Sequence, residues 1–223
     1  MKSFTVIGAG LAAAVAAAAN ATVTGLQVEY AGFLSADGQA ARHVWNVYAV
    51  TTNSQNVFLN VVGHTVIAGS MSGVQHHDVN SQFLGGQGQW DPGQTGTPGQ
   101  QTIDSYVTAT GLPGTGTSLD PSFPGGGAGA TIPSGAGWFD GEPTSPTLFT
   151  GGRVKIMQVA GATYSNTAGG AFYTARLSVG YKLNTSSTSP IIAENLTYTI
   201  GVPAPGALAL LGLAGLAGRR RRA

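Results

Sequence analysis

The chain has 223 residues, with 35 Gly, 11 Pro and no Cys, and only 9% of its residues are charged. An average soluble domain has about 25% charged residues, and this length suits one domain. The absence of cysteine excludes disulfides, thiolate chemistry and Cys-ligated zinc. Five of the ten basic residues lie at the two ends, whereas all nine acidic residues lie between Glu29 and Glu194. A mildly acidic middle with few cations argues against nucleic-acid binding.

Residues 1–21 have the three-part layout of a secretory signal peptide. Lys2 precedes an apolar run from Phe4 to Ala19, and the small residues Ala19 and Ala21 flank a cleavage site before Thr22. We therefore expect the rest of the chain to be exported.

The same segment also matches a dinucleotide-binding fingerprint, Gly-x-Gly-x-x-Ala, at Gly8, Gly10 and Ala13. Glu29 lies near the position of the acid that binds ribose in such folds. The fingerprint needs a βαβ context. The run 12–19 has no polar face, as a surface crossover helix should have, and no amphipathic helix followed by a buried strand comes later. These features favour the signal peptide.

The other end of the chain has three parts as well. Val202, Pro203, Ala204 and Pro205 precede the apolar run 206–218, and Arg219, Arg220, Arg221 and Arg222 follow it. As a helix this run rises about 20 Å, less than the roughly 30 Å hydrocarbon core of a bilayer. The arginines would hold that end in the cytoplasm.

This end resembles the PEP-CTERM sorting signal of bacterial exported proteins. The resemblance implies processing near the proline motif by an exosortase-type membrane enzyme, after membrane association through the C-terminal helix. It also implies delivery to the cell envelope or extracellular matrix, with the export machinery as a further partner. The sequence departs from the family at Ala204, where glutamate is usual. A plain C-terminal membrane anchor is the alternative.

Residues 22–201 form the predicted domain, and their pattern is that of β-strands. Runs rich in β-branched and aromatic residues, bounded by Gly, Asn, Ser and Pro, predict strands at 42–52, 56–68, 102–110, 153–164, 171–183 and 191–200. With no stretch of helical periodicity between them, an all-β, antiparallel β-sandwich is expected. The region 85–150 is dense in Gly and Pro and predicts a long loop excursion.

Two sets of residues could give the predicted domain, residues 22–201, which we call the body, a carbohydrate-related function. Trp90 and Trp138 are candidate platforms on which sugar rings would stack, and the alternative is that they pin the loop region to the core. Asp140 and Glu142 flank Gly141, and paired carboxylates beside aromatics suit a polysaccharide hydrolase. Asp-Gly is also a common turn dipeptide, and the turn is favoured.

The sequence predicts no metal or cofactor. His76, His77 and Asp78 are the sole cluster of metal-capable residues, but neighbouring strand residues point to opposite faces, so a polar turn is favoured. We therefore expect an exported, non-enzymatic surface or matrix protein. The alternative is a surface carbohydrate-binding module whose partner is extracellular polysaccharide.

Overall fold

The computed structural model describes residues 22–35, 40–71, 90, 101–112, 116–121, 123, 131–142, 144–161 and 171–201. The predicted signal peptide (1–21), sorting segment (202–223) and His76-His77-Asp78 cluster lie outside these residues. In the described part no helix is long and apolar enough to cross a lipid bilayer.

The described residues are built from strands and one short 3-10 turn, η3 (Thr150–Gly152). The strands are β1 (Val23–Leu34), β2 (Arg42–Thr51), β3 (Val57–Gly69), β4 (Tyr106–Val107), β5 (Thr117–Leu119), β6 (Ala136–Asp140), β7 (Arg153–Gly161), β8 (Ala171–Lys182) and β9 (Ile191–Gly201).

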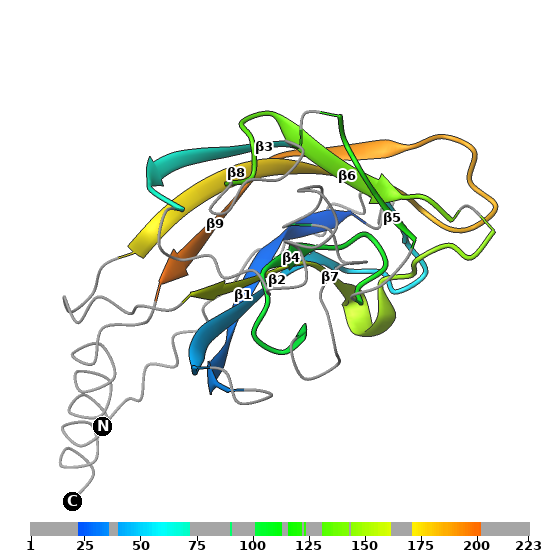
Figure 1. Cartoon of the computed structure of the whole chain (residues 1–223). Helices are drawn as coiled ribbons and strands as arrows, with labels where there is room; N and C mark the ends of the chain where they lie inside the picture. The colour runs from blue at the N-terminus through cyan, green and yellow to red at the C-terminus, as the bar shows by residue number, and fades with distance from the viewer. Residues whose placement is uncertain are drawn as a thin grey trace, which may run out of the picture.

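The strands form two antiparallel sheets that face each other, as Figure 1 shows. Sheet A has the order β1-β2-β7-β4, and sheet B has the order β5-β6-β3-β8-β9. The edge strands β1 and β9 lie against each other, although they belong to different sheets. The prediction of an all-β, antiparallel sandwich is therefore confirmed.

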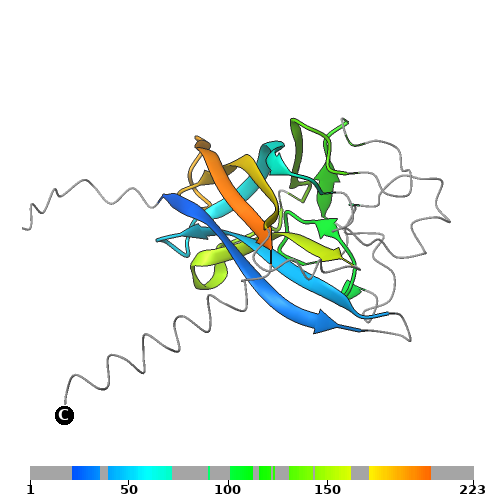
Figure 2. The same cartoon turned by 90° about the vertical axis from the view of Figure 1, so that its left-hand side faces the viewer.

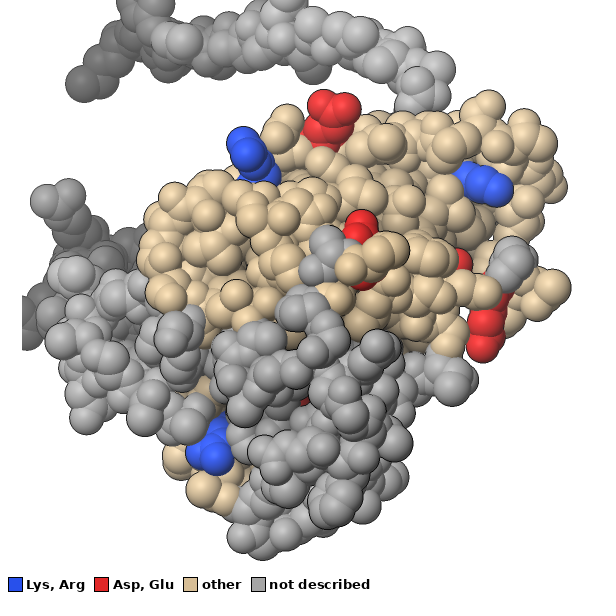
Figure 3. Space-filling view, turned by 45° about the horizontal axis from the view of Figure 1, so that its top comes forward, with Lys and Arg blue, Asp and Glu red and all other residues tan. Residues whose placement is uncertain are grey.

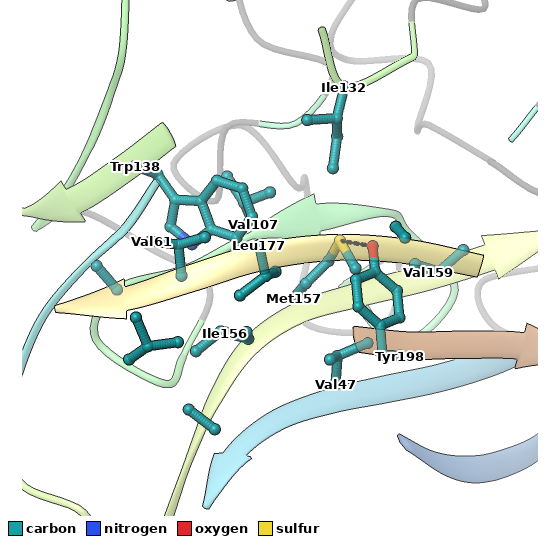
Figure 4. Close-up of a cluster of buried hydrophobic side chains, with 14 of the residues drawn as sticks. Val47, Val61, Val107, Ile132, Trp138, Ile156, Met157, Val159, Leu177 and Tyr198 are labelled. Carbon is teal, nitrogen blue, oxygen red and sulfur yellow. Dashed lines mark hydrogen bonds between the residues drawn. The ribbon is translucent and has the colours of Figure 1, made fainter. Parts of the chain in front are cut away.

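The core lies between the sheets and is drawn in Figure 4. Sheet A contributes Val47, Ile156 and Val159, and sheet B contributes Val61 and Leu177, all of them buried. In β2, β3 and β8 the core residues alternate with less buried neighbours, as the two-residue period of a strand requires, whereas β7 is buried on both faces along most of its length. Burial of apolar surface on both inner faces therefore fixes the register of each strand.

Strand prediction was accurate for the long runs of β-branched residues and wrong at two places. The long strand β1 was missed, because Gly25, Ala31 and Gly32 dilute its pattern. The predicted strand 102–110 contains only the two-residue strand β4. Residues 162–164 of another predicted strand lie outside the described part.

The Gly/Pro-rich region is only partly a loop. Within 85–150, strands β5 and β6 pair with each other, and β6 pairs with β3. Gly137 makes this second pairing possible, since a Cβ there would lie 2.6 Å from the Val61 carbonyl oxygen. A glycine that lowers strand propensity thus permits a close approach of two strands.

Candidate functional site

The stacking role predicted for Trp138 is wrong, because its ring is buried. Trp138 is 0% exposed on β6, and its Nε1 donates a hydrogen bond to the Thr108 carbonyl oxygen at 3.2 Å. Phe123 lies edge-on to the ring, with the centroids 6.4 Å apart. A ring in this setting cannot offer a face to a sugar, and its contacts favour an anchoring role.

Trp90 is not a stacking platform either. It is 2% exposed and belongs to the core cluster. Its carbonyl oxygen accepts a hydrogen bond from the Val107 amide at 2.9 Å, which ties it to β4. The burial of both rings agrees with the alternative that the sequence favoured, in which the two tryptophans pin the loop region to the core.

Asp140 holds a turn. Its Oδ1 accepts the Glu142 amide at 2.9 Å, and its Oδ2 accepts the Thr147 amide at 3.3 Å. This is the self-bonded turn that Asp favours. A cavity of about 160 Å³ beside it is also lined by Lys182 and Pro146. Ligand sites for small molecules typically enclose about 300–1,000 Å³, so this hollow is small for a sugar.

The described residues include no group of three or more His, Asp or Glu side chains placed to hold a metal ion. His43 lies on β2 of sheet A, whereas His64 lies on β3 of sheet B. His64 is buried against Tyr198, and burial lowers its pKa to about 4. A second cavity of about 390 Å³ is lined by residues without titratable side chains, Val66, Gly69, Ser70, Met71, Thr131, Ile132 and Ser134.

Lys155 forms a half-buried polar cluster on β7. Its Nζ donates a hydrogen bond to Tyr106 Oη at 2.5 Å and lies 3.4 Å from Gln158 Oε1. Gln158 Nε2 donates in turn to the Asp104 carbonyl oxygen at 2.8 Å. Burial lowers the pKa of Lys155 to about 8. The cluster ties β7 to the segment before β4, and its polar side chains form hydrogen bonds within the cluster.

An exposed group of aromatic rings lies at the hairpin end of β1 and β2. We name Tyr30, Phe33 and His43 the aromatic shelf, with Trp45 at its inner end. Exposure rises outward from 1% for Trp45 to 39% for Tyr30 and 59% for Phe33. In Figure 2 the β1–β2 ribbon projects beyond β8 and β9 of sheet B, so the inner face of sheet A continues past the core.

A β-bulge brings the shelf onto one face. Tyr30 is opposite Trp45, Gly32 is opposite Val44 and Phe33 is opposite His43, so Ala31 is an extra residue in β1. Without it, Phe33 would point away from Tyr30, since strand residues alternate between faces. Gly32 has φ of 129°, a conformation that favours glycine. The shelf therefore depends on a local irregularity that hydrophobic periodicity does not reveal.

The rings of the shelf lie at shallow angles to one another. Phe33 and His43 have centroids 4.6 Å apart and planes at 36°, and Tyr30 and His43 have centroids 5.9 Å apart and planes at 26°. Tyr30 Oη lies 2.7 Å from His43 Nδ1, within hydrogen-bond distance. Burial lowers the pKa of His43, which favours its neutral form. Among the described residues, the shelf therefore has apolar ring faces and a polar edge and includes no Lys, Arg, Asp or Glu side chain.

No family model matches this chain, and neither does any curated protein or solved structure with which it was compared.

Proposed function

We propose that this chain is an exported, non-enzymatic protein of the bacterial cell surface or extracellular matrix. Its sandwich would be the delivered body, and its two ends would direct export and sorting. One observation carries the proposal: the described strands begin at Val23, the second residue after Ala21, and end at Gly201, directly before Val202. Every described strand would survive removal of both ends.

The described surface of the sandwich carries few charged side chains. Figure 3 shows a face on which the charged side chains are few and far apart. The outer side of sheet B carries hydroxyl pairs instead, such as Thr174 and Thr199, whose Oγ1 atoms lie 3.0 Å apart. Such a surface does not neutralise phosphates, which supports the expectation of no nucleic-acid partner.

The sorting part of the proposal rests on the resemblance of residues 202–223 to a PEP-CTERM signal. The export machinery would act first on residues 1–21. An exosortase-type enzyme would then cut near Pro203 and Pro205, while the apolar run holds the protein at the membrane. The body would finally reside in the envelope or the matrix.

Expression of the full chain in a bacterium that contains an exosortase-type enzyme tests both steps. We expect to find the sandwich outside the inner membrane. Its intact mass should correspond to a chain that begins at Thr22 and lacks Arg219–Arg222. The double variant Pro203→Ala/Pro205→Ala should stay membrane-bound and unprocessed. Pro190→Ala is the matched control, since this exposed proline precedes β9 and should not alter processing. A full-length chain in the cytoplasm would overturn the proposal.

A further inference from the structure

We propose that the aromatic shelf is a carbohydrate-binding site, on which pyranose rings of a neutral polysaccharide stack against Phe33 and Tyr30. This goes beyond export and sorting, because it assigns a ligand class to the body. It also moves the expected site from the two buried tryptophans to the end of the β1–β2 hairpin.

The open ring faces are the first argument. Phe33 lies at only 36° to His43 and is 59% exposed, so much of its apolar surface is open. Phe33 and Tyr30 thus place exposed aromatic surface side by side at the hairpin end of β1 and β2.

The charge of the shelf selects a neutral ligand. Glu29, the one charged neighbour of the shelf on β1, points to the opposite face of the strand, where its carboxylate pairs with Arg153 at 3.1 Å. Arg42, next to His43 on β2, likewise points to that opposite face. A sugar ring, with an apolar C–H face, matches this surface better than an anionic polymer does.

The polar groups at the edge of the shelf can form hydrogen bonds with the hydroxyl groups around a sugar ring. Tyr30 Oη and His43 Nδ1 form a donor–acceptor pair beside the ring faces. Sugar hydroxyls both donate and accept hydrogen bonds, so they can join such a pair while the ring stacks. A mostly apolar surface with a few placed polar groups is the usual composition of a ligand site.

The size of the shelf favours sugar rings over a second copy of this chain. An aromatic side chain buries about 150–250 Å² when fully covered. With Phe33 at 59% and Tyr30 at 39% exposure, the open aromatic area is on the order of 200 Å². A stable protein interface needs about 800 Å² from each partner. The shelf therefore suits one or two pyranose rings.

Affinity electrophoresis of the purified full chain tests the proposal, in native gels that contain soluble β-glucan, galactomannan or dextran. We expect at least one of these neutral polysaccharides to retard the chain. Phe33→Ala should raise the dissociation constant about tenfold, the loss of one stacked ring. Phe139→Ala is the matched control, since this phenylalanine is also exposed, at 45%, but lies on β6 of sheet B. It should bind like the wild type.

Four outcomes would overturn the proposal. They are no retardation by any of the three neutral polysaccharides, retardation by anionic alginate alone, an equal loss in Phe139→Ala, and concentration-dependent self-association that Phe33→Ala abolishes. The last would show that a second copy covers the shelf. The assay uses purified protein, so its result does not depend on sorting, and a failure of export would leave it unaffected.

Discussion

His64 of β3 and Tyr198 of β9 meet in the core, with Nε2 and Oη 2.7 Å apart, although 134 residues separate them in the chain. Tyr198 Oη donates in turn to Met157 Sδ at 3.9 Å, the contact dashed in Figure 4. The other ring nitrogen of His64, Nδ1, is buried and has no hydrogen-bond partner among the described residues. Burial of the ring disfavours its charged form, which lowers the pKa of His64.

The first prediction is a loss of stability in acid that depends on His64. His64 has a pKa of 6.5 in the unfolded chain, whereas its pKa in the folded chain is about 4. The neutral His64 therefore makes its full contribution to the free energy of unfolding above pH 6.5. This contribution, about 3 kcal/mol in total, is lost as the pH falls toward 4. Denaturant unfolding from pH 4 to 7.5 measures this.

His64→Gln is the control for that experiment, because glutamine can still donate to Tyr198 but does not titrate. All other ionisable groups are the same in both proteins, so the difference between the two curves isolates His64. Parallel curves for the two proteins would contradict the assignment.

The fold was largely predictable from sequence, and the reason lies in period-two patterning. In β8, Tyr173, Leu177 and Val179 are buried, and Arg176 between them is exposed. A pattern of this kind determines both the type of element and its inner face. Short strands such as β5, with three residues, are too brief to carry a period and were not predicted.

The candidate site could not be predicted in the same way. Trp90 and Trp138 lie in a polar, glycine-rich region, and nothing local distinguishes a buried ring from an exposed one. The shelf requires that Phe33 and His43 be opposite each other across a bulge, which is a property of pairing between strands. The run Tyr30-Ala31-Gly32-Phe33 was the available signal, since a glycine inside a strand suggests a bulge.

The second prediction concerns the tryptophans. Trp45, Trp90 and Trp138 are the three tryptophans of the chain, and each is at most 2% exposed. Intrinsic fluorescence should therefore be blue-shifted, and acrylamide should quench it only weakly until the protein unfolds. Strong quenching of the native protein would contradict their burial.

The third prediction concerns Lys155, whose ammonium group is half-buried among neutral hydrogen-bond partners. Because burial disfavours the charged form, its pKa is lowered to about 8. NMR titration of the lysine side-chain Cε–Hε signals should show one lysine with a midpoint near pH 8. That signal should be absent in Lys155→Met. If Lys155 titrates at the ordinary value of 10.5, the cluster is more hydrated than described.

The fourth prediction concerns Asp140, whose carboxylate holds the turn after β6. Asp140→Asn keeps an acceptor for the Glu142 amide at 2.9 Å but loses the longer hydrogen bond from the Thr147 amide at 3.3 Å, so it should lower the free energy of unfolding less than Asp140→Ala does. Asp140→Ala removes both hydrogen bonds and should destabilise the protein by about 1 kcal/mol. Urea denaturation of the two variants measures this. A larger loss in Asp140→Asn than in Asp140→Ala would show that the charge, and not the turn, matters.

The fifth prediction compares two glycines of β1. Gly32 has φ of 129°, which side chains rarely adopt, so Gly32→Ala should lower the free energy of unfolding by about 1–3 kcal/mol. Gly25 has open space around its Cβ position and no positive φ, so Gly25→Ala should change stability by at most about 0.5 kcal/mol. Urea denaturation measures both values. Because Gly32 places Phe33 opposite His43, Gly32→Ala should also change the near-UV circular dichroism of the shelf, whereas Gly25→Ala should not. Equal behaviour of the two variants would show that the bulge does not hold the aromatic rings together.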